Sequence, residues 1–201
     1  FNYRRGATSV VHIGAIDMGG DNPVRIQSMT TTNTNDTDGC VAQAERIIRA
    51  GGELVRLTTQ GSREAENLKN INAGIRADGY DTPLVADIHF NPHVADVAAL
   101  YAEKVRINPG NYVDPARKFI HQEYTDEEYA QELRKIEERF IPFLDICRAH
   151  HTAIRIGVNH GSLSDRIRNR YGDTPEGIVE SCMEFLRICK KQHFDDVVIS
   201  I

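Results

Sequence analysis

The sequence has no apolar run long enough to cross a membrane. None of its uninterrupted apolar stretches approaches the ~18 residues that a membrane-spanning helix needs. The first residues, FNYRRGATS, also lack the hydrophobic segment of a secretory signal peptide. We therefore expect a soluble protein that does not contact a membrane.

Clustered basic residues are missing as well. The 201 residues include 24 Lys and Arg against 29 Asp and Glu, which gives a formal net charge of -5, and the basic residues form no run. Proteins that bind nucleic acids normally present a basic stripe or patch to the phosphate backbone. The composition therefore argues against nucleic acid as a partner.

The cysteines lack the close spacing of a metal or redox motif. Cys40, Cys147, Cys182 and Cys189 include no CxxC pair, and the last three fall on apolar faces of predicted helices. Buried free cysteines behave as small hydrophobic residues. We predict four reduced core thiols, no metal ligand within this sequence, and a cytoplasmic location.

Two hydrophobic periods alternate along the chain. Short apolar runs of strand length occupy residues 24–29, 53–59, 83–90, 104–110, 153–159 and 195–201. Between them, apolar residues recur every three or four positions, which is typical of amphipathic helices. Predicted N-caps support four of these helices: Ser62, Asn91, Thr125 and Thr174. Glu128 would complete a capping box with Thr125.

Nearly continuous apolar strands that alternate with helices predict a parallel sheet covered on both faces. A doubly wound nucleotide fold is disfavoured, because QSMTTTNTND after the first strand has no glycine-rich phosphate turn. We predict an α/β TIM (β/α)8 barrel that is truncated after about six β/α units. An N-terminal β-hairpin, formed by residues 9–13 and 24–29, should precede it. Residues 1–201 would then be the N-terminal part of one substrate-binding domain, and the open edges of its sheet should expose apolar side chains.

Arginine interrupts three of the apolar strands. Because side chains alternate along a strand, polar residues at the strand ends fall on shared faces. Arg56 lies on a face with Thr58, Asp87 with His89, Arg106 with Asn108, and Arg155 with Gly157 and Asn159. In TIM barrels the carboxyl ends of the strands and the loops after them form the site. We expect these side chains to converge on one mouth.

The charges at this mouth do not balance. Burial of an unpaired guanidinium is costly, and Asp87 is the one carboxylate at the predicted strand ends against Arg56, Arg106 and Arg155. The planar guanidinium matches two phosphate oxygens at once. A bound phosphate or diphosphate ester would supply the missing negative charge.

Three alternatives remain open. The arginines could pair with carboxylates from neighbouring helices, which would leave a barrel with no anion site. The stretch DIHFNPH could instead hold a metal on Asp87, His89 and His93, as in a metal-dependent barrel hydrolase. A non-catalytic phosphate-binding barrel would keep the arginines without any redox chemistry.

Five motifs in the sequence resemble a known family. PVRIQSMT, LVADIHF, RINPGN, RIGVNHGSLSDRI and YGDTPEGIVESCMEF occur in this order, and together they resemble the 4-hydroxy-3-methylbut-2-enyl diphosphate synthases of the non-mevalonate isoprenoid pathway. The segment NYVDPARKFIHQEYTDEEY is similar to the large form of these enzymes. The resemblance covers the chain from about Arg4 to Ile201.

The resemblance implies a barrel that binds 2-C-methyl-D-erythritol 2,4-cyclodiphosphate and, beyond the end of this chain, a domain with a 4Fe-4S cluster. Ferredoxin or flavodoxin would donate two electrons that open the ring and remove a hydroxyl. By position in the motifs, Arg56, Arg106, Arg155 and Asn159 would clamp the diphosphate, and Asp87, His89 and Asn108 would line the same mouth. No catalytic residue and no cluster ligand is assigned within this chain, which alone should be inactive.

Overall fold

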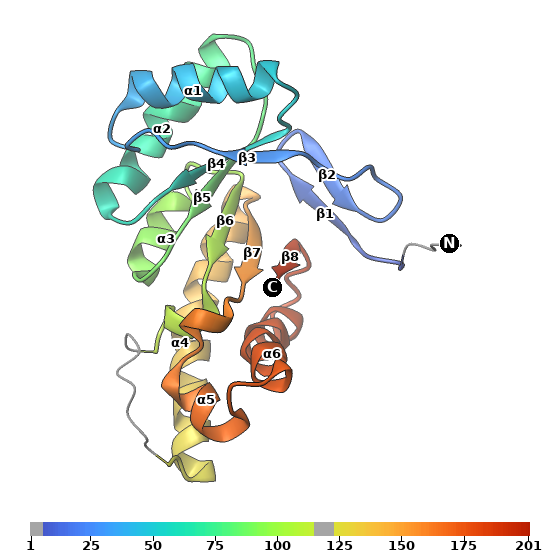
Figure 1. Ribbon diagram of the computed structural model, residues 1–201, viewed down its shortest axis with the longest axis vertical. Coiled ribbons are helices and arrows are strands. Elements are labelled where there is room, and N and C mark those ends of the chain that lie inside the picture. The colour runs from blue at the N-terminus through green and yellow to red at the C-terminus, as the bar shows by residue number, and fades with distance from the viewer. Residues whose placement is uncertain (1–5, 115–122) are drawn as a thin grey trace.

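The computed structural model describes residues 6–114 and 123–201 (Figure 1). The strands are β1 (Val10–Ile13), β2 (Ile16–Gly19), β3 (Gln27–Met29), β4 (Leu54–Thr58), β5 (Leu84–Asp87), β6 (Lys104–Ile107), β7 (Ala153–Gly157) and β8 (Val197–Ser200). The helices are α1 (Thr37–Arg49), α2 (Ser62–Ala77), α3 (Pro92–Ala98), α4 (Asp126–His150), α5 (Asp165–Tyr171) and α6 (Pro175–Lys191), with short 3₁₀ helices η1 (Pro109–Asn111) and η2 (His160–Ser162). Part of the segment that resembles the large form, residues 115–122, lies outside the described residues.

The main sheet has six parallel strands in chain order, β3-β4-β5-β6-β7-β8. It curls like part of a barrel wall, and the helices lie along its outer face (Figure 1). The order does not reverse about the first strand, as it would in a doubly wound sheet. The predicted α/β barrel architecture is therefore confirmed.

Apolar packing divides into two cores on opposite faces of the sheet. The larger core lies between sheet and helices and includes Val55, Leu57 and Val105. A smaller core on the inner face joins Leu54, Val85 and Ala153, near the starts of their strands, to residues of the β1–β2 hairpin. The hairpin therefore covers the inner face at the amino ends of the strands, and the carboxyl ends remain available for polar side chains.

The predicted hairpin was wrong in its second strand. β1 pairs antiparallel with β2 through a turn at Gly14 and Ala15, and Gly14 has the positive φ of 53° that such a tight turn favours. Within residues 24–29, Gln27–Met29 instead form β3, which pairs parallel with β4. Glu53 fixes this segment, since its carboxylate accepts from the Ile26 amide at 2.8 Å and from Arg25 at 2.7 Å.

Three of the four predicted N-caps are confirmed. Asn91 accepts from the His93 amide at 3.0 Å, Thr174 from Gly177 at 3.2 Å, and Thr125 forms the expected capping box. The prediction at Ser62 was wrong by one residue: Gly61 occupies the N-cap position and Ser62 begins α2. A glycine N-cap costs little compared with serine, so the sequence signal was ambiguous there.

The sheet edges expose apolar side chains, as expected. Met29 on β3 is partly exposed, and Ile199 on β8 and Ile201 after it are more so. Within residues 6–114 and 123–201, the helices are too short or too polar to span a bilayer.

Candidate anion-binding site

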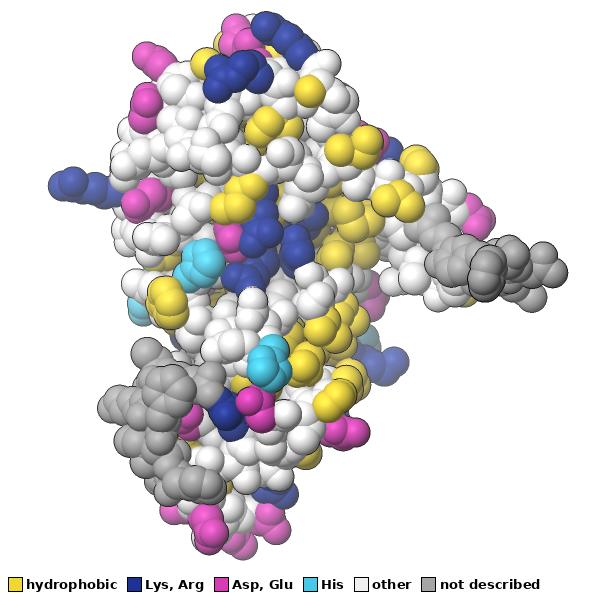
Figure 2. Space-filling model, viewed as in Figure 1, with side chains coloured by type: hydrophobic (Ala, Val, Ile, Leu, Met, Phe, Trp, Pro, Cys, Tyr) yellow, Lys and Arg dark blue, Asp and Glu magenta, His cyan; other side chains and the backbone are white. Residues whose placement is uncertain are grey.

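The strand arginines meet on the inner face of the sheet. In the parallel register Asp87 lies beside Arg106, and Arg106 beside Arg155, so their side chains project to the same side. Arg56 lies on the neighbouring strand, aligned with Val85, which precedes Asp87 by two residues and so shares its face. Figure 2 shows basic side chains gathered at the centre of this hollowed face, with an acidic side chain beside them. We call Arg56, Arg106 and Arg155, together with Asp87, the arginine basin.

Asp87 is the ionic centre of the basin. Its Oδ2 lies 2.6 Å from Arg56 Nη2, its Oδ1 lies 3.3 Å from Arg106 Nη1, and the residue is only 2% exposed. His89 Nε2 lies 3.4 Å from the same Oδ2. The carboxylate that pairs with two of the arginines therefore comes from the sheet itself, and within the described residues none of the three arginines pairs with a helix carboxylate, as the alternative without an anion site requires.

Arg155 has no carboxylate partner among the described residues. Its Nη2 donates to Ser200 Oγ at 2.6 Å, and its buried Nε has no hydrogen-bond partner there. The buried Nε of Arg56 is also unpartnered within the described part of the chain. Two of the three guanidinium groups thus share one carboxylate, and Arg56 and Arg155 each retain an unused donor, which is the arrangement expected of a site for an anion.

Burial and mutual repulsion lower the pKa values of two of these arginines. Burial is the main cause for Arg155, with further lowering by Arg56 and Arg106. Burial also dominates for Arg106, where Asp87 acts in the opposite direction. Arginine remains protonated despite such shifts because its intrinsic pKa is so high. The lowered pKa values therefore indicate that the charged form of these arginines is destabilised in the ligand-free protein. A bound anion would stabilise the charged form.

Gly157 gives Arg106 the space to reach across the basin. The guanidinium Nη2 of Arg106 donates to the Gly157 carbonyl at 2.9 Å. A Cβ on Gly157 would lie 2.4 Å from Arg106 Nε, closer than any real contact of that kind. Glycine is therefore required at this position for the observed path of the arginine.

The two asparagines shape the loops above the strands. Asn108 Oδ1 accepts from the Gly110 amide at 3.1 Å, and its Nδ2 donates to Ser162 Oγ at 2.8 Å. Asn159 Oδ1 accepts from the Gly161 amide at 2.9 Å. Asn108 is thus at the mouth, as predicted, but both ends of its amide are already engaged in joining η1 to η2. Asn159 caps η2 and is exposed.

The structure does not assemble the predicted alternative metal site. Among the described residues, no group of three or more His, Cys, Asp or Glu side chains is placed to hold a metal ion. The side chain of His93 is 80% exposed, and its Nδ1 lies 3.7 Å from Asp96 on the same helix. We therefore do not pursue the metal-dependent hydrolase.

The cysteines do not fit an iron–sulfur cluster. All four are free and buried, on α1, α4 and α6. Burial raises the pKa of Cys40 to about 11 and that of Cys189 to about 12, and it also raises those of Cys147 and Cys182. Cluster ligands are thiolates, and these environments favour the neutral thiol.

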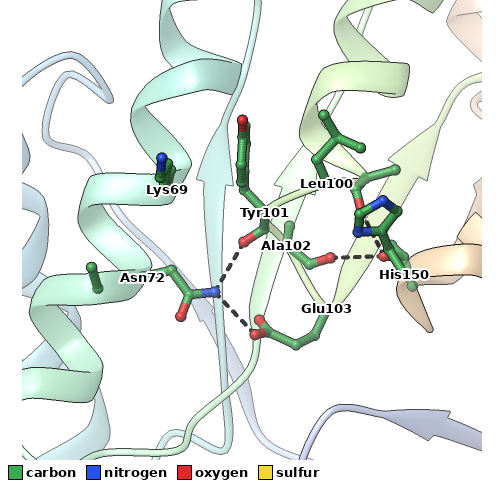
Figure 3. Close-up of a pocket in the computed structure, with 10 residues that line it drawn as sticks. Lys69, Asn72, Leu100, Tyr101, Ala102, Glu103 and His150 are labelled. Atoms are coloured by element: carbon green, nitrogen blue, oxygen red, sulfur yellow. Dashed lines mark hydrogen bonds between the residues drawn. The ribbon is translucent and has the colours of Figure 1, made fainter. Parts of the chain in front are cut away.

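A separate cavity of about 280 Å³ lies at the other end of the strands (Figure 3). Its lining includes Glu103 and Thr152, which immediately precede β6 and β7. Asn72 Nδ2 donates to the Tyr101 carbonyl at 2.9 Å and to Glu103 Oε1 at 3.0 Å. These polar groups satisfy one another, and packing at this end of a TIM barrel serves stability.

Lys104 is an inward-facing residue that the sequence analysis missed. It is 1% exposed, and the register aligns it with Val85 and Ala153 of the inner core. The signal was present in the sequence, because Lys104 and Arg106 are two residues apart on one strand and must share a face.

Comparison with known proteins agrees with this geometry. The model of the GcpE TIM-barrel domain family matches residues 8–201. The chain belongs to this family. A 4-hydroxy-3-methylbut-2-en-1-yl diphosphate synthase (flavodoxin) from Phocaeicola vulgatus is 76% identical over all 201 residues, and one from Akkermansia muciniphila is 51% identical over the same length. The GcpE-family chain covers 33% and 34% of these two proteins, so it spans about a third of the length of the curated relatives it matches.

A solved structure supports the fold of the GcpE-family chain. The phospho-2-dehydro-3-deoxyheptonate aldolase of Thermotoga maritima matches 96% of this chain and 45% of its own, with a TM-score of 0.54 and 11% identity. At this low identity the likeness concerns the barrel architecture alone.

Proposed function

We propose that this chain forms the substrate-binding part of a 4-hydroxy-3-methylbut-2-enyl diphosphate synthase, a cytoplasmic enzyme of the non-mevalonate isoprenoid pathway. The arginine basin is the single observation that carries the proposal, because its surplus positive charge calls for a dianionic ligand. The substrate would be 2-C-methyl-D-erythritol 2,4-cyclodiphosphate. The names of the full-length relatives support this reaction.

The basin has the chemistry to hold a diphosphate. Arg155, with an unpartnered Nε and no carboxylate among the described residues, would bind phosphate oxygens most directly. Arg56 and Arg106 would keep their bonds to Asp87 and use their remaining N–H groups on the ligand. Each charge-assisted hydrogen bond contributes about 1.5–3 kcal/mol.

The mouth residues would orient the rest of the substrate. His89, one third exposed and held by Asp87, lies where it could donate to a substrate oxygen. Asn159 caps η2 at the exposed rim, and Asn108 would act by fixing η1 against η2. In this proposal these residues bind and orient the substrate. Asp87 would hold the side chains of Arg56 and Arg106 in place when no ligand is bound.

The electrons would come from outside this chain. Reductive ring opening consumes two electrons and two protons, breaks a ring C–O bond, and releases a hydroxyl as water. In this proposal a 4Fe-4S cluster outside the chain would supply the electrons, and flavodoxin or ferredoxin would reduce the cluster again. The names of the relatives specify flavodoxin. The cluster ligands would lie outside the chain, since its described thiols do not fit.

Calorimetry with the cyclic diphosphate tests the proposal. The protein should bind 2-C-methyl-D-erythritol 2,4-cyclodiphosphate and should show no measurable binding of unphosphorylated 2-C-methyl-D-erythritol, because the basin recognises the phosphates. Equal binding of both compounds, or of neither, would contradict the proposed function. Binding of inorganic phosphate but not of the cyclic diphosphate would instead indicate a non-catalytic anion-binding barrel.

A further inference from the structure

Lys104 lies on the inner face of the sheet, beside the arginine basin. It precedes Arg106 by two residues on β6, so it lies about 6–7 Å nearer the amino end on the same face. Beside it are Val85 on β5 and Ala153 on β7, both in the inner apolar core. Lys104 is therefore level with Arg56, which is also aligned with Val85, and one inward position nearer the amino end than Arg106 and Arg155.

No hydrogen bond or ion pair of the Lys104 ammonium occurs within residues 6–114 and 123–201. A buried lysine is normally paired, because loss of hydration penalises its charge strongly. The charged groups that act on its pKa are Arg155 from β7 and Arg56 from β4, and Asp87 and Arg106 lie one inward position further along the same face. The one carboxylate of this set is already shared by Arg56 and Arg106.

We propose that Lys104 is a fourth cation of the anion site, and that it takes up a proton when a phosphate-bearing anion occupies the arginine basin. The inference deepens the proposed function and rests on it, because it assumes that the basin binds phosphates. Lys104 would not touch the ligand. It would act as a positioning charge near the arginines. Its positive charge would increase when the ligand binds, because the amine then takes up a proton.

The electrostatics of the empty basin give the reason. Burial, together with repulsion by Arg155 and Arg56, lowers the pKa of Lys104 to about 8. A significant fraction of the amines is therefore neutral near pH 8 in the ligand-free protein. A dianion in the basin would screen the arginines and attract the ammonium, which raises the pKa of Lys104 and draws in a proton.

This linkage predicts a pH-dependent affinity. Below the ligand-free pKa of about 8 the lysine is already charged, so affinity should be constant. As the pH rises above this value, the neutral amine must first be protonated, and affinity should decline by up to about tenfold per pH unit. The same proton should be visible in binding calorimetry, because the buffer supplies it.

Trimetaphosphate is a suitable probe, since it is a cyclic phosphate anion whose oxygens stay ionised throughout this range. Its binding heat at about pH 8 should differ between Tris and HEPES buffers in proportion to their ionisation enthalpies, with an uptake of up to about half a proton. The difference should persist in Arg187→Met, which removes an exposed charge on α6 outside the basin. It should vanish in Lys104→Met.

Two variants distinguish charge from packing. Lys104→Met should weaken trimetaphosphate binding about tenfold near pH 7 and flatten its pH profile, because a unit charge at this range contributes a little over 1 kcal/mol. Lys104→Arg should keep the affinity but lose the pH dependence, because arginine does not titrate here. The wild-type buffer comparison remains decisive even if a variant does not fold.

The outcomes separate the two proposals. If trimetaphosphate does not bind the wild-type protein at any pH, the proposed function is overturned together with this inference. If it binds with equal heat in both buffers, or if Lys104→Met retains the proton uptake, the anion site stands and the role of Lys104 is overturned.

Discussion

The side chain of Arg106 occupies the space that a side chain on Gly157 would fill. The guanidinium of Arg106 donates to the Gly157 carbonyl at 2.9 Å, and a Cβ on Gly157 would lie 2.4 Å from Arg106 Nε. The contact crosses between adjacent strands, from β6 to β7. One missing side chain thus determines the direction in which the central arginine of the basin points.

Gly157→Ala should displace Arg106 and weaken anion binding. Gly157 has no positive φ, so the backbone accepts alanine and the cost falls on the arginine rather than on the strand. Loss of one charge-assisted bond corresponds to about 1.5–3 kcal/mol, or about 10- to 150-fold in affinity for the cyclic diphosphate. Titration calorimetry measures this change.

The matched control is Gly6→Ala, where a Cβ would meet nothing within 4 Å. It should leave affinity unchanged. Unaltered affinity in Gly157→Ala as well would show that Arg106 does not contribute to the anion site in its observed position.

Two substitutions of Arg155 should separate the contribution of its bidentate geometry to ligand affinity from the contribution of its charge. Arg155→Met should reduce affinity for the cyclic diphosphate by about 1.5–3 kcal/mol for one lost bond, and more if two are lost. Arg155→Lys should recover only part of the affinity, because an ammonium cannot present two parallel donors to one phosphate. Calorimetry or fluorescence titration of both variants measures the order of affinities.

Arg187→Met is the control for a general charge effect. Arg187 lies on α6, more than half exposed, and pairs with Glu180. Its loss should leave affinity within experimental error. An equal loss in Arg187→Met and Arg155→Met would indicate a nonspecific effect of net charge and not a defined basin.

The sequence was sufficient to predict the parallel strands and the convergence of their arginines. Period-two alternation places Arg106 and Asn108 on one face, and strand order follows from the helix between each pair of strands. The sequence was not sufficient to predict which side chains pair with one another across the sheet. That Asp87 joins Arg56 to Arg106, and that Ser200 accepts from Arg155, depends on lateral register and rotamers.

The errors also have physical causes. The hairpin was misassigned because Gly19, Gly20 and Pro23 form the stronger turn signal in composition, whereas the tight turn lies at Gly14 and Ala15. Lys104 was overlooked because its type favours the surface. Propensity rules describe average environments, and a buried strand position beside three arginines is not an average environment for a lysine.

A buried ion-pair network holds the loops around the mouth, and Glu184→Gln should destabilise it. Arg166 forms a bidentate pair with Glu184 at 2.6 and 2.8 Å, and Tyr129 donates to the same carboxylate at 2.5 Å. Arg166 and Glu184 have side chains only 2% exposed. Without the Glu184 charge, the buried Arg166 keeps only its longer contacts with Asp114 at 3.2 and 3.3 Å, so we expect a loss of up to about 3–5 kcal/mol in the free energy of unfolding, measured with urea.

Glu180→Gln provides the control on the same helix. Glu180 pairs with the exposed Arg187, and exposed pairs contribute about 0–1 kcal/mol. Because Asp114 also contacts Arg166 and lies three residues after η1, the Glu184 variant should additionally lose anion affinity. Similar stability of the two variants would show that the buried network does not stabilise the fold.

The stability of the protein should depend on pH through Lys104. The folded pKa of about 8 lies below the ordinary value of 10.5, so the folded state holds this proton less tightly than the unfolded state. Below about pH 8 both states are protonated, and the cost of the buried charge is fully present. Between about pH 8 and 10.5 the unfolded state binds more protons, so the free energy of unfolding should rise with pH.

Lys104→Met removes this titration and isolates it from the others. Near pH 7 the variant should be more stable than the wild type by about 3 kcal/mol, since each pKa unit corresponds to about 1.4 kcal/mol, and the difference should shrink as the pH approaches about 10. Tyrosine and cysteine titrations are common to both proteins and cancel in the comparison. Urea unfolding at several pH values measures the difference. Stability curves that run parallel from pH 7 to 10 would mean that Lys104 finds a partner or keeps its hydration in the folded protein, and that its charge is not held at a cost.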